Sequence, residues 1–221
     1  MSKSITVGDL LNCFFDESRT QFQFLVQKHG YRQVLGMSYE RKGRQVIVPY
    51  NGKTVSMPFR AISRYEQGNI TLELVYNGEY YILEPLYYYQ HYKLSWPELF
   101  AQLLTEEQVK DMPTRTHQFV HPETLTSAIR KSATLLKNTV CLYQPNKRNE
   151  KCLETAINQA LQDRYENEMK LYCEHATQAF LDRDYKRVIA LMRPFERDLS
   201  LSDKKMLELA IKRIIDPIAG D

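Results

Sequence analysis

Few side chains in this 221-residue sequence have the types and spacing that chemistry requires. The clearest set is the triplet Glu40-Arg41-Lys42, an E-x-K pattern of the kind that serves metal-dependent nucleases, where the carboxylate holds a divalent ion and the lysine orients water. Such a triplet belongs on a central strand, with a second carboxylate shortly before it. Here Gly43 follows at a predicted turn, and the preceding acids Asp16-Glu17 fall in a predicted helix. We therefore expect a solvated turn and keep a metal-dependent nuclease as a third hypothesis.

Histidines and cysteines are the other residues that could bind a metal or attack a substrate. His117 and His121 are four residues apart, a metal-ligand spacing when both lie on a helix. Because Pro122 favours extended backbone at His121, we interpret both as loop histidines. The cysteines are spread along the chain without a C-x-x-C pair: Cys13, Cys141, Cys152 and Cys173. We expect free thiols in a reducing cytoplasm, no bound metal or cofactor, and no cysteine nucleophile.

The sequence gives no support to a phosphate or nucleic-acid site. It contains no G-x-S-x-G, G-x-x-x-x-G-K-[ST] or G-x-G-x-x-G motif, and its eight glycines leave little backbone freedom for cradling phosphate. The net charge is +3, and basic and acidic residues are interleaved. Nucleic-acid binding needs basic residues gathered on one face. We therefore expect a protein that is not an enzyme and does not bind nucleic acid.

The N-terminal segment has the apolar spacing of helices. Thr6 and Asp9 fit a capping box, a second capping box at Ser18 favours two short helices, and Gly30 is a stop signal. One face should enter a core through Phe14, Phe15, Phe22, Leu25 and Val26.

Short segments rich in Val, Ile and Tyr follow, separated by Gly or Asn-Gly. We expect strands at residues 31–39, 45–50, 53–58, 70–76 and 79–84. Asn51-Gly52 and Asn77-Gly78 predict hairpins, since a type I′ turn requires positive φ at both central residues. Brief helices should follow at 95–103 and 105–110, the first with Pro97 near its start. The predicted fold class is α+β, with an N-terminal helix packed on an antiparallel β-sheet.

The second half of the sequence is helical. Residues 112–122 hold two prolines, two histidines and polar residues, which predicts a boundary between an α+β domain at 1–112 and a helical domain at 113–221. Helices are expected at 124–140 and 151–181.

The last helices form a hairpin unit over residues 171–214. Asp182-Arg183-Asp184 predicts a turn, Pro194 ends the next helix, and Ser200 with Asp203 can cap a third. The buried stripe of that third helix is expected at Leu207, Ala210, Ile211 and Ile214. An acidic turn ending in Asp-Tyr and followed by a β-branched pair resembles one tetratricopeptide-type helical hairpin. Since one such unit cannot bury its faces alone and no second copy occurs, we expect it to pack on another part of the molecule.

Aromatic residues are unusually dense between positions 80 and 96. Alternation along a strand should turn about half of them into the core and leave others exposed, where tyrosine and tryptophan often anchor protein interfaces. A stacking platform for single-stranded nucleic acid would need interleaved basic residues, and only Lys93 is present. The predicted partner-binding residues are Tyr80, Tyr87, Tyr88, Tyr89, Tyr92 and Trp96.

Both ends of the chain are similar to one functional class. A helix with a phenylalanine-rich face, followed by HGYRQVLG and valine-rich hairpins, resembles the N-terminal part of many bacterial immunity proteins that neutralise polymorphic toxins. The terminal FLDRDYKRVIALMRPFERDLSLSDKKMLELAIKR resembles the helical tail of several such families, with its F-x-x-x-D-Y-x-x-V-I segment. The long helical middle has no counterpart. The resemblance implies an intracellular binding protein without catalytic residues, whose partner is a cognate protein toxin.

The sequence therefore predicts a cytoplasmic, non-enzymatic immunity protein that occludes the active site of a toxin. The N-terminus lacks the pattern of a secretory signal, and no run approaches the ~20 apolar residues of a membrane span. The alternative is a cytoplasmic adaptor or sensor that binds a peptide or helix of a cellular partner. Neither hypothesis specifies an oligomeric state.

Overall fold

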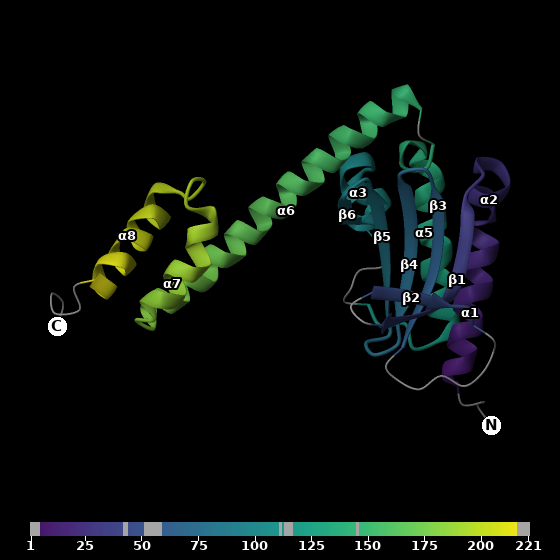
Figure 1. The fold of residues 1–221 in the computed structure, drawn as a ribbon, viewed down its shortest axis with the longest axis horizontal. Helices are drawn as coiled ribbons and strands as arrows, with labels where there is room; N and C mark the ends of the chain where they lie inside the picture. The colour runs from purple at the N-terminus through teal and green to yellow at the C-terminus, as the bar shows by residue number, and fades with distance from the viewer. Residues whose placement is uncertain are drawn as a thin grey trace. The chain divides into compact units, whose positions relative to one another are not determined.

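The structure, a computed structural model, describes residues 5–41, 44–50, 59–110, 112, 117–144 and 146–215. It divides into two compact units, Met1–Ala160 and Leu161–Asp221. The predicted α+β class is confirmed, because an N-terminal helical segment precedes a six-stranded antiparallel sheet and helices follow (Figure 1).

Two helices open the first unit, α1 (Val7–Gln21) and α2 (Gln23–His29). The predicted capping box is present: Asp9 N donates to Thr6 Oγ1 at 3.2 Å, and Thr6 N donates to Asp9 Oδ2 at 2.9 Å. Gly30, with φ of 70°, ends α2 in the left-handed conformation, as expected. The second predicted cap is wrong, because Ser18 is buried inside α1 and the helix breaks at Phe22 instead.

The sheet has the strand order β2-β1-β3-β4-β5-β6, and each neighbouring pair is antiparallel. Its strands are β1 (Arg32–Arg41), β2 (Arg44–Val48), β3 (Arg60–Gln67), β4 (Ile70–Asn77), β5 (Ile82–Tyr89) and β6 (Tyr92–Ser95). The sequence prediction missed β3 and β6. The strand predicted at 53–58 and the hairpin at Asn51-Gly52 lie outside the described residues.

The β4–β5 hairpin forms where Asn77-Gly78 predicts it, but its turn is longer than the expected two residues. Asn77 pairs with Ile82, and the positive φ, 56°, falls at Tyr81. Gly78 serves a different purpose, because a Cβ at this position would lie 2.2 Å from the ring of Phe59. The glycine therefore permits a close approach between the turn and an aromatic side chain.

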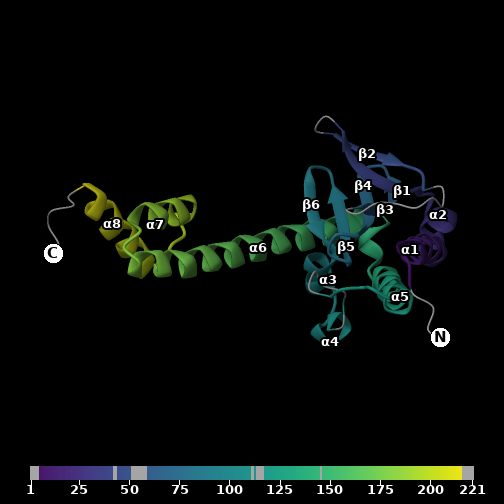
Figure 2. The same cartoon turned by 90° about the horizontal axis from the view of Figure 1, so that it is seen from below.

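Helices cover one face of the sheet, as Figure 2 shows for α1, α3 and α5. The later elements of this layer are α3 (Trp96–Leu103), α4 (Glu106–Val109), α5 (Pro122–Asn138), the 3₁₀ helix η1 (Val140–Leu142) and the start of α6 (Lys147–Leu181). The two brief helices predicted before residue 110 are thus confirmed. Helix α5 packs along α1, where Arg130 Nη2 lies 2.8 Å from Glu17 Oε1. The first unit consequently extends to Ala160, whereas the sequence places a boundary between residues 112 and 113.

Aromatic rings fill the space between the helices and the sheet. The ring of Phe22 lies 5.5 Å from that of Tyr65 and 5.8 Å from that of Trp96. Two polar groups of this layer donate to backbone carbonyls: Tyr65 Oη to Ser18 O at 2.8 Å, and Trp96 Nε1 to Leu86 O at 2.8 Å. Of the residues predicted for this core, Val26 is 37% exposed and does not belong to it.

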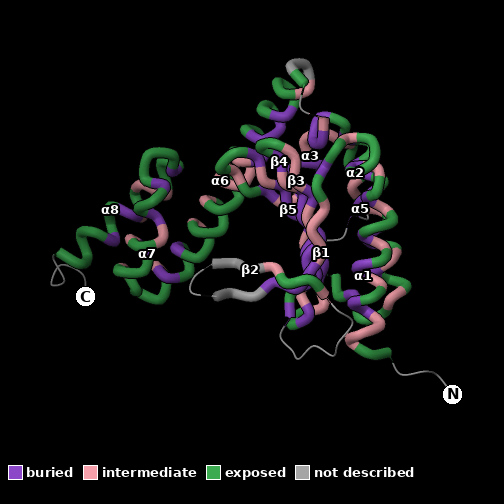
Figure 3. Tube along the Cα trace, turned by 45° about the vertical axis from the view of Figure 1, so that its right-hand side comes forward, coloured by how far each residue is buried: buried purple, intermediate pink, exposed green. Residues whose placement is uncertain are grey.

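The second unit contains the end of α6, then α7 (Tyr185–Met192), the 3₁₀ helix η2 (Arg193–Phe195) and α8 (Leu201–Ile215). Asp184 caps α7 through Arg187 N at 3.1 Å, and Ser200 Oγ accepts from Asp203 N at 3.2 Å, as predicted. Figure 3 marks the buried stretches, which in this unit are Ala176, Ala179, Val188, Met192, Phe195, Leu199, Leu207 and Ala210.

One correction applies to the helical hairpin. Ile211 and Ile214 are exposed, because α8 turns only Leu207 and Ala210 fully inward. The buried cluster is formed within this unit, with Met169 and Cys173 of α6 packed against it, and packing of the hairpin on another part of the molecule stays a prediction.

Substitution of Gly36 by alanine should destabilise the first unit. A Cβ on Gly36 would lie 2.4 Å from the carbonyl oxygen of Val48, so β2 would have to move. We expect Gly36→Ala to lower the free energy of unfolding by about 1–3 kcal/mol. Urea denaturation followed by the fluorescence of Trp96, the chain's one tryptophan and buried in this unit, measures the change.

The matched control is Gly8→Ala in α1, where the nearest atom to the new Cβ is 3.5 Å away. It should leave stability unchanged or raise it, because alanine favours helix. Equal urea midpoints for the two variants would contradict the close contact at Gly36.

Candidate partner-binding face

The strand register sorts side chains onto two faces of the sheet. Ala61, Ser63 and Tyr65 of β3 turn toward the helices, so Arg60, Arg64 and the residues in phase with them turn away. The helices α1, α3 and α5 do not cover this second face (Figure 2). We call it the charged strand face, and define it by Arg32, Arg60, Arg64, Glu66, Glu73, Glu84, Tyr88 and Lys93.

Ion pairs run across three neighbouring strands of this face. Arg64 donates from both Nε and Nη2 to Glu73 Oε2, each at 2.7 Å. Its Nη1 also lies 3.8 Å from Glu66 Oε1, and Glu66 in turn accepts from Arg32 Nε at 3.1 Å. The result is a chain of alternating charges from β1 through β3 to β4, which fixes the positions of long side chains that would otherwise be free to move.

Glu73 is the anchor of this series of ion pairs, with only 1% of its side chain exposed. A buried carboxylate is tolerable only with a close partner, and Arg64, 23% exposed, supplies it while remaining accessible from outside. A small apolar cluster, Ile62, Val75 and Leu86, lies on the same face as the pair. Ile47 of β2 and Tyr88 pack against this cluster and bury it.

Tyr88 and Lys93 extend the face toward the sheet edge. The ammonium of Lys93 lies 5.7 Å from the centre of the Tyr88 ring, and Tyr88 also packs against the apolar cluster. Burial, with a smaller contribution from the Glu73 carboxylate, raises the pKa of Tyr88 to about 12. Its hydroxyl consequently stays protonated near neutral pH and can donate a hydrogen bond to a partner.

The predicted partner-binding residues are scattered by the structure. Tyr87, Tyr89 and Trp96 are buried on the helix side of the sheet and pack the core, so they offer no surface. Tyr92 is half-buried on the same side, with its ring 4.0 Å from that of His91. Tyr80 is 54% exposed in the β4–β5 turn. Of these six residues, Tyr88 alone lies on the charged strand face.

Sequence reasoning missed the charged residues of the face because it missed β3. The signal was present in RAISRYEQ, where Arg60, Ile62, Arg64 and Glu66 alternate with smaller or aromatic residues at a period of two. Charges at alternate positions lowered the apolar content below that of the other strands. The acidic partners, Glu73 and Glu84, sit singly within predicted strands and gave no signal of their own.

The other candidate groups do not gather into a site. The backbone of Glu40 pairs with Gln45 one residue before the end of β1, while its side chain and Lys42 lie outside the described residues, so the nuclease triplet stays a prediction. His121 has extended backbone, φ −123° and ψ 139°, as Pro122 predicts. Across the described ranges no three His, Cys, Asp or Glu side chains are grouped as metal ligands would be. In the same ranges no helix combines the length and apolarity needed to span a membrane.

Comparison with known proteins adds no relative. No protein-family model matches the chain, and neither curated proteins nor solved structures give a match. The resemblance to immunity proteins thus stays a hypothesis carried by the residues quoted for it.

Replacing Glu73 by glutamine tests the anchor of the charged strand face. The substitution keeps shape but leaves Arg64 without its charged acceptor in a partly buried site. We expect Glu73→Gln to lower the free energy of unfolding by about 2–3 kcal/mol, measured by urea denaturation with Trp96 fluorescence.

Glu84→Gln is the matched control on the same face. Glu84 pairs at 3.6 Å with Arg60, whose side chain is 46% exposed, so its loss should cost at most about 1 kcal/mol. Equal losses from the two substitutions would show that Glu73 is not the anchor.

Proposed function

We propose that this chain is a non-enzymatic binding protein that contacts a partner protein through the charged strand face. The observation that supports it most is the Arg64–Glu73 pair, which holds a partly exposed guanidinium on the same face as an apolar cluster. Arginine and tyrosine side chains at well-packed positions are among those that most often dominate the binding energy of protein interfaces. Charges of both signs, closely interleaved, favour selection of a complementary protein over nucleic acid.

The partner that we propose is a cognate toxin domain, which makes the chain an immunity protein. This step rests on the resemblance of the N-terminal helix and hairpins and of the C-terminal tail, and the strand face supplies the surface. Occlusion of a toxin's active site would require an interface of about 1,600 Å² in total. Six strands with one face free of α1, α3 and α5 offer a rigid platform for such an interface.

A second candidate function has an observation of its own. The helical unit exposes several large apolar side chains, among them Leu181, Leu201 and Leu209. An adaptor that binds a peptide or helix would use such a surface. The two candidates place the binding site on different units of the chain and can be separated by substitution.

Binding should be tested with the toxin domain encoded by the gene adjacent to this one. Co-expression with the full chain should relieve its toxicity, and the two proteins should co-purify. Arg32, with 75% of its side chain exposed, and the exposed Lys93 can be reversed in charge without disturbing the core. We expect Arg32→Glu and Lys93→Glu each to weaken binding by about tenfold or more in calorimetry. In each variant a carboxylate replaces a positive charge and faces a partner surface that complements the original charge.

Lys205→Glu on α8 is the control for a charge reversal away from the face, and it should bind as the unchanged chain does. Absence of both rescue and complex would overturn the toxin as partner. A complex that survives both strand-face substitutions but is lost in Leu209→Asp would move the site to the helical unit.

A further inference from the structure

Basic and acidic side chains on the charged strand face differ in how much of their surface solvent can reach. The arginine is the more exposed member of three ion pairs across the face: Arg32–Glu66, 75% against 28%; Arg60–Glu84, 46% against 17%; and Arg64–Glu73, 23% against 1%. The longer contact between Arg64 and Glu66, at 3.8 Å, joins two side chains of similar exposure. The accessible charge of the face is therefore mainly basic.

This order has a physical reason in the lengths of the side chains. Side chains on one face of a sheet leave it from a common level. Because an arginine side chain is longer than a glutamate side chain, its charged end reaches further into water when the two are paired. A cationic partner would reach little of Glu73 or Glu84, whereas an anionic partner can approach Arg32 and Arg60 directly. The face is therefore suited to an anionic partner.

The strand register places the most exposed cations in one row. Arg32 pairs with Glu66, Glu66 with Thr71, Thr71 with Tyr88, and Tyr88 with Lys93, so the row crosses β1, β3, β4, β5 and β6. Its end members, Arg32 and Lys93, are both exposed, and none of the five residues is buried. The two ends are four strand spacings apart, roughly 19 Å. The row thus carries a positive charge at each end and polar side chains between them.

We propose that this row binds an acidic stripe on the surface of the partner protein, with carboxylates of the partner at Arg32 and Lys93. The inference rests on the proposed function and adds the chemistry of the partner. Arginine donates paired hydrogen bonds to a carboxylate, which gives such a contact a defined geometry. Arg64, two positions from Glu66 along β3, adds positive charge beside the row.

The acids within the face favour a protein over a nucleic acid as this partner. Glu66 and Glu84 are partly exposed among the cations. They would repel the closely and evenly spaced phosphates of a nucleic acid. A protein surface can instead place its carboxylates at the two ends of the row and neutral groups between them.

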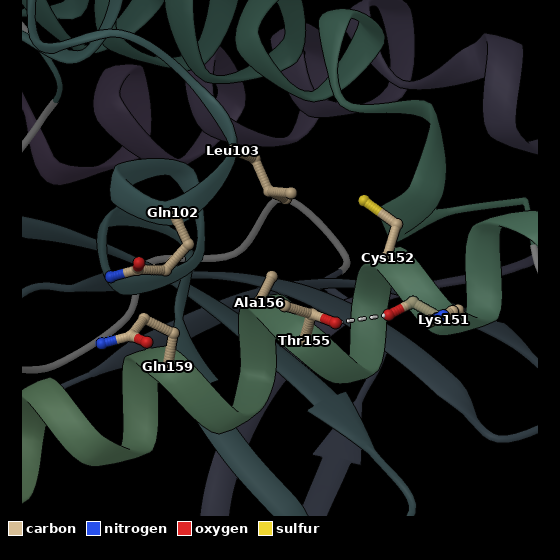
Figure 4. A pocket seen from close by; sticks show the side chains of 7 residues that line it. All are labelled: Gln102, Leu103, Lys151, Cys152, Thr155, Ala156 and Gln159. Atoms are coloured by element: carbon tan, nitrogen blue, oxygen red, sulfur yellow. Dashed lines mark hydrogen bonds between the residues drawn. The ribbon is translucent and has the colours of Figure 1, made fainter.

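The cavity on the helix side of the sheet carries a single charge among its described lining residues. It has a volume of about 470 Å³ and lies between α3 and the start of α6. Figure 4 shows Gln102 on one side of it and Thr155 and Gln159 on the other. Its charged residue is Lys151, which is exposed. Lys151 therefore serves as a matched control for Lys93, because it has the same charge and lies in the same unit but outside the row.

The full chain should be titrated against a fluorescein-labelled peptide of ten glutamates, followed by fluorescence anisotropy at low ionic strength. We expect Arg32→Gln and Lys93→Gln each to weaken binding by about threefold or more, because each removes one end of the row. Lys151→Gln should bind as the unchanged chain does. Glu66→Gln should strengthen binding by about twofold or more, because it removes a negative charge within the row. A purely structural role of the Glu66 ion pairs would instead weaken it.

Two further probes decide the class of partner. A peptide of ten lysines should not bind, and a strand of ten thymidine nucleotides should bind more weakly than the glutamate peptide. Tighter binding of the DNA strand, absence of glutamate-peptide binding, or equal losses in Lys93→Gln and Lys151→Gln would overturn the acidic stripe. Rescue from the toxin without peptide binding would leave the proposed function standing and remove this inference. Peptide binding without rescue would keep the acidic stripe and remove the toxin as partner.

Discussion

The docking of the aromatic face of α1 on the sheet is the interaction on which the rest of the first unit depends. The ring of Phe14 stacks 5.9 Å from that of Tyr76, and Phe22 packs against Tyr65, whose hydroxyl is bonded to the carbonyl of Ser18. These contacts decide which face of the sheet is covered. Helix α5 packs along α1 on the covered face. On the opposite face, polar side chains pair with one another instead of with helix residues.

On the charged strand face, charged side chains form ion pairs with one another, and a small apolar cluster lies on the same face. Burying Glu73 is costly, and the cost is offset by two hydrogen bonds from Arg64, whose side chain is 23% exposed. A fixed guanidinium loses less freedom when it meets a partner than a mobile one does, which is why this face, more than any single tyrosine, supports a binding function. The helical unit instead exposes large apolar side chains, among them Leu181, Leu201 and Leu209.

Local chemistry in the sequence determined the caps at Thr6 and Ser200, the left-handed stop at Gly30, the long helix α6, the hairpin between β4 and β5, and the α+β class. These features depend on residues a few positions apart, whose propensities act before the chain folds. Tertiary structure alone decided that β3 exists, which tyrosines are buried, and that Arg64 meets Glu73. Each of these depends on strand pairing or on helix packing against the sheet, which bring together residues that no local pattern relates.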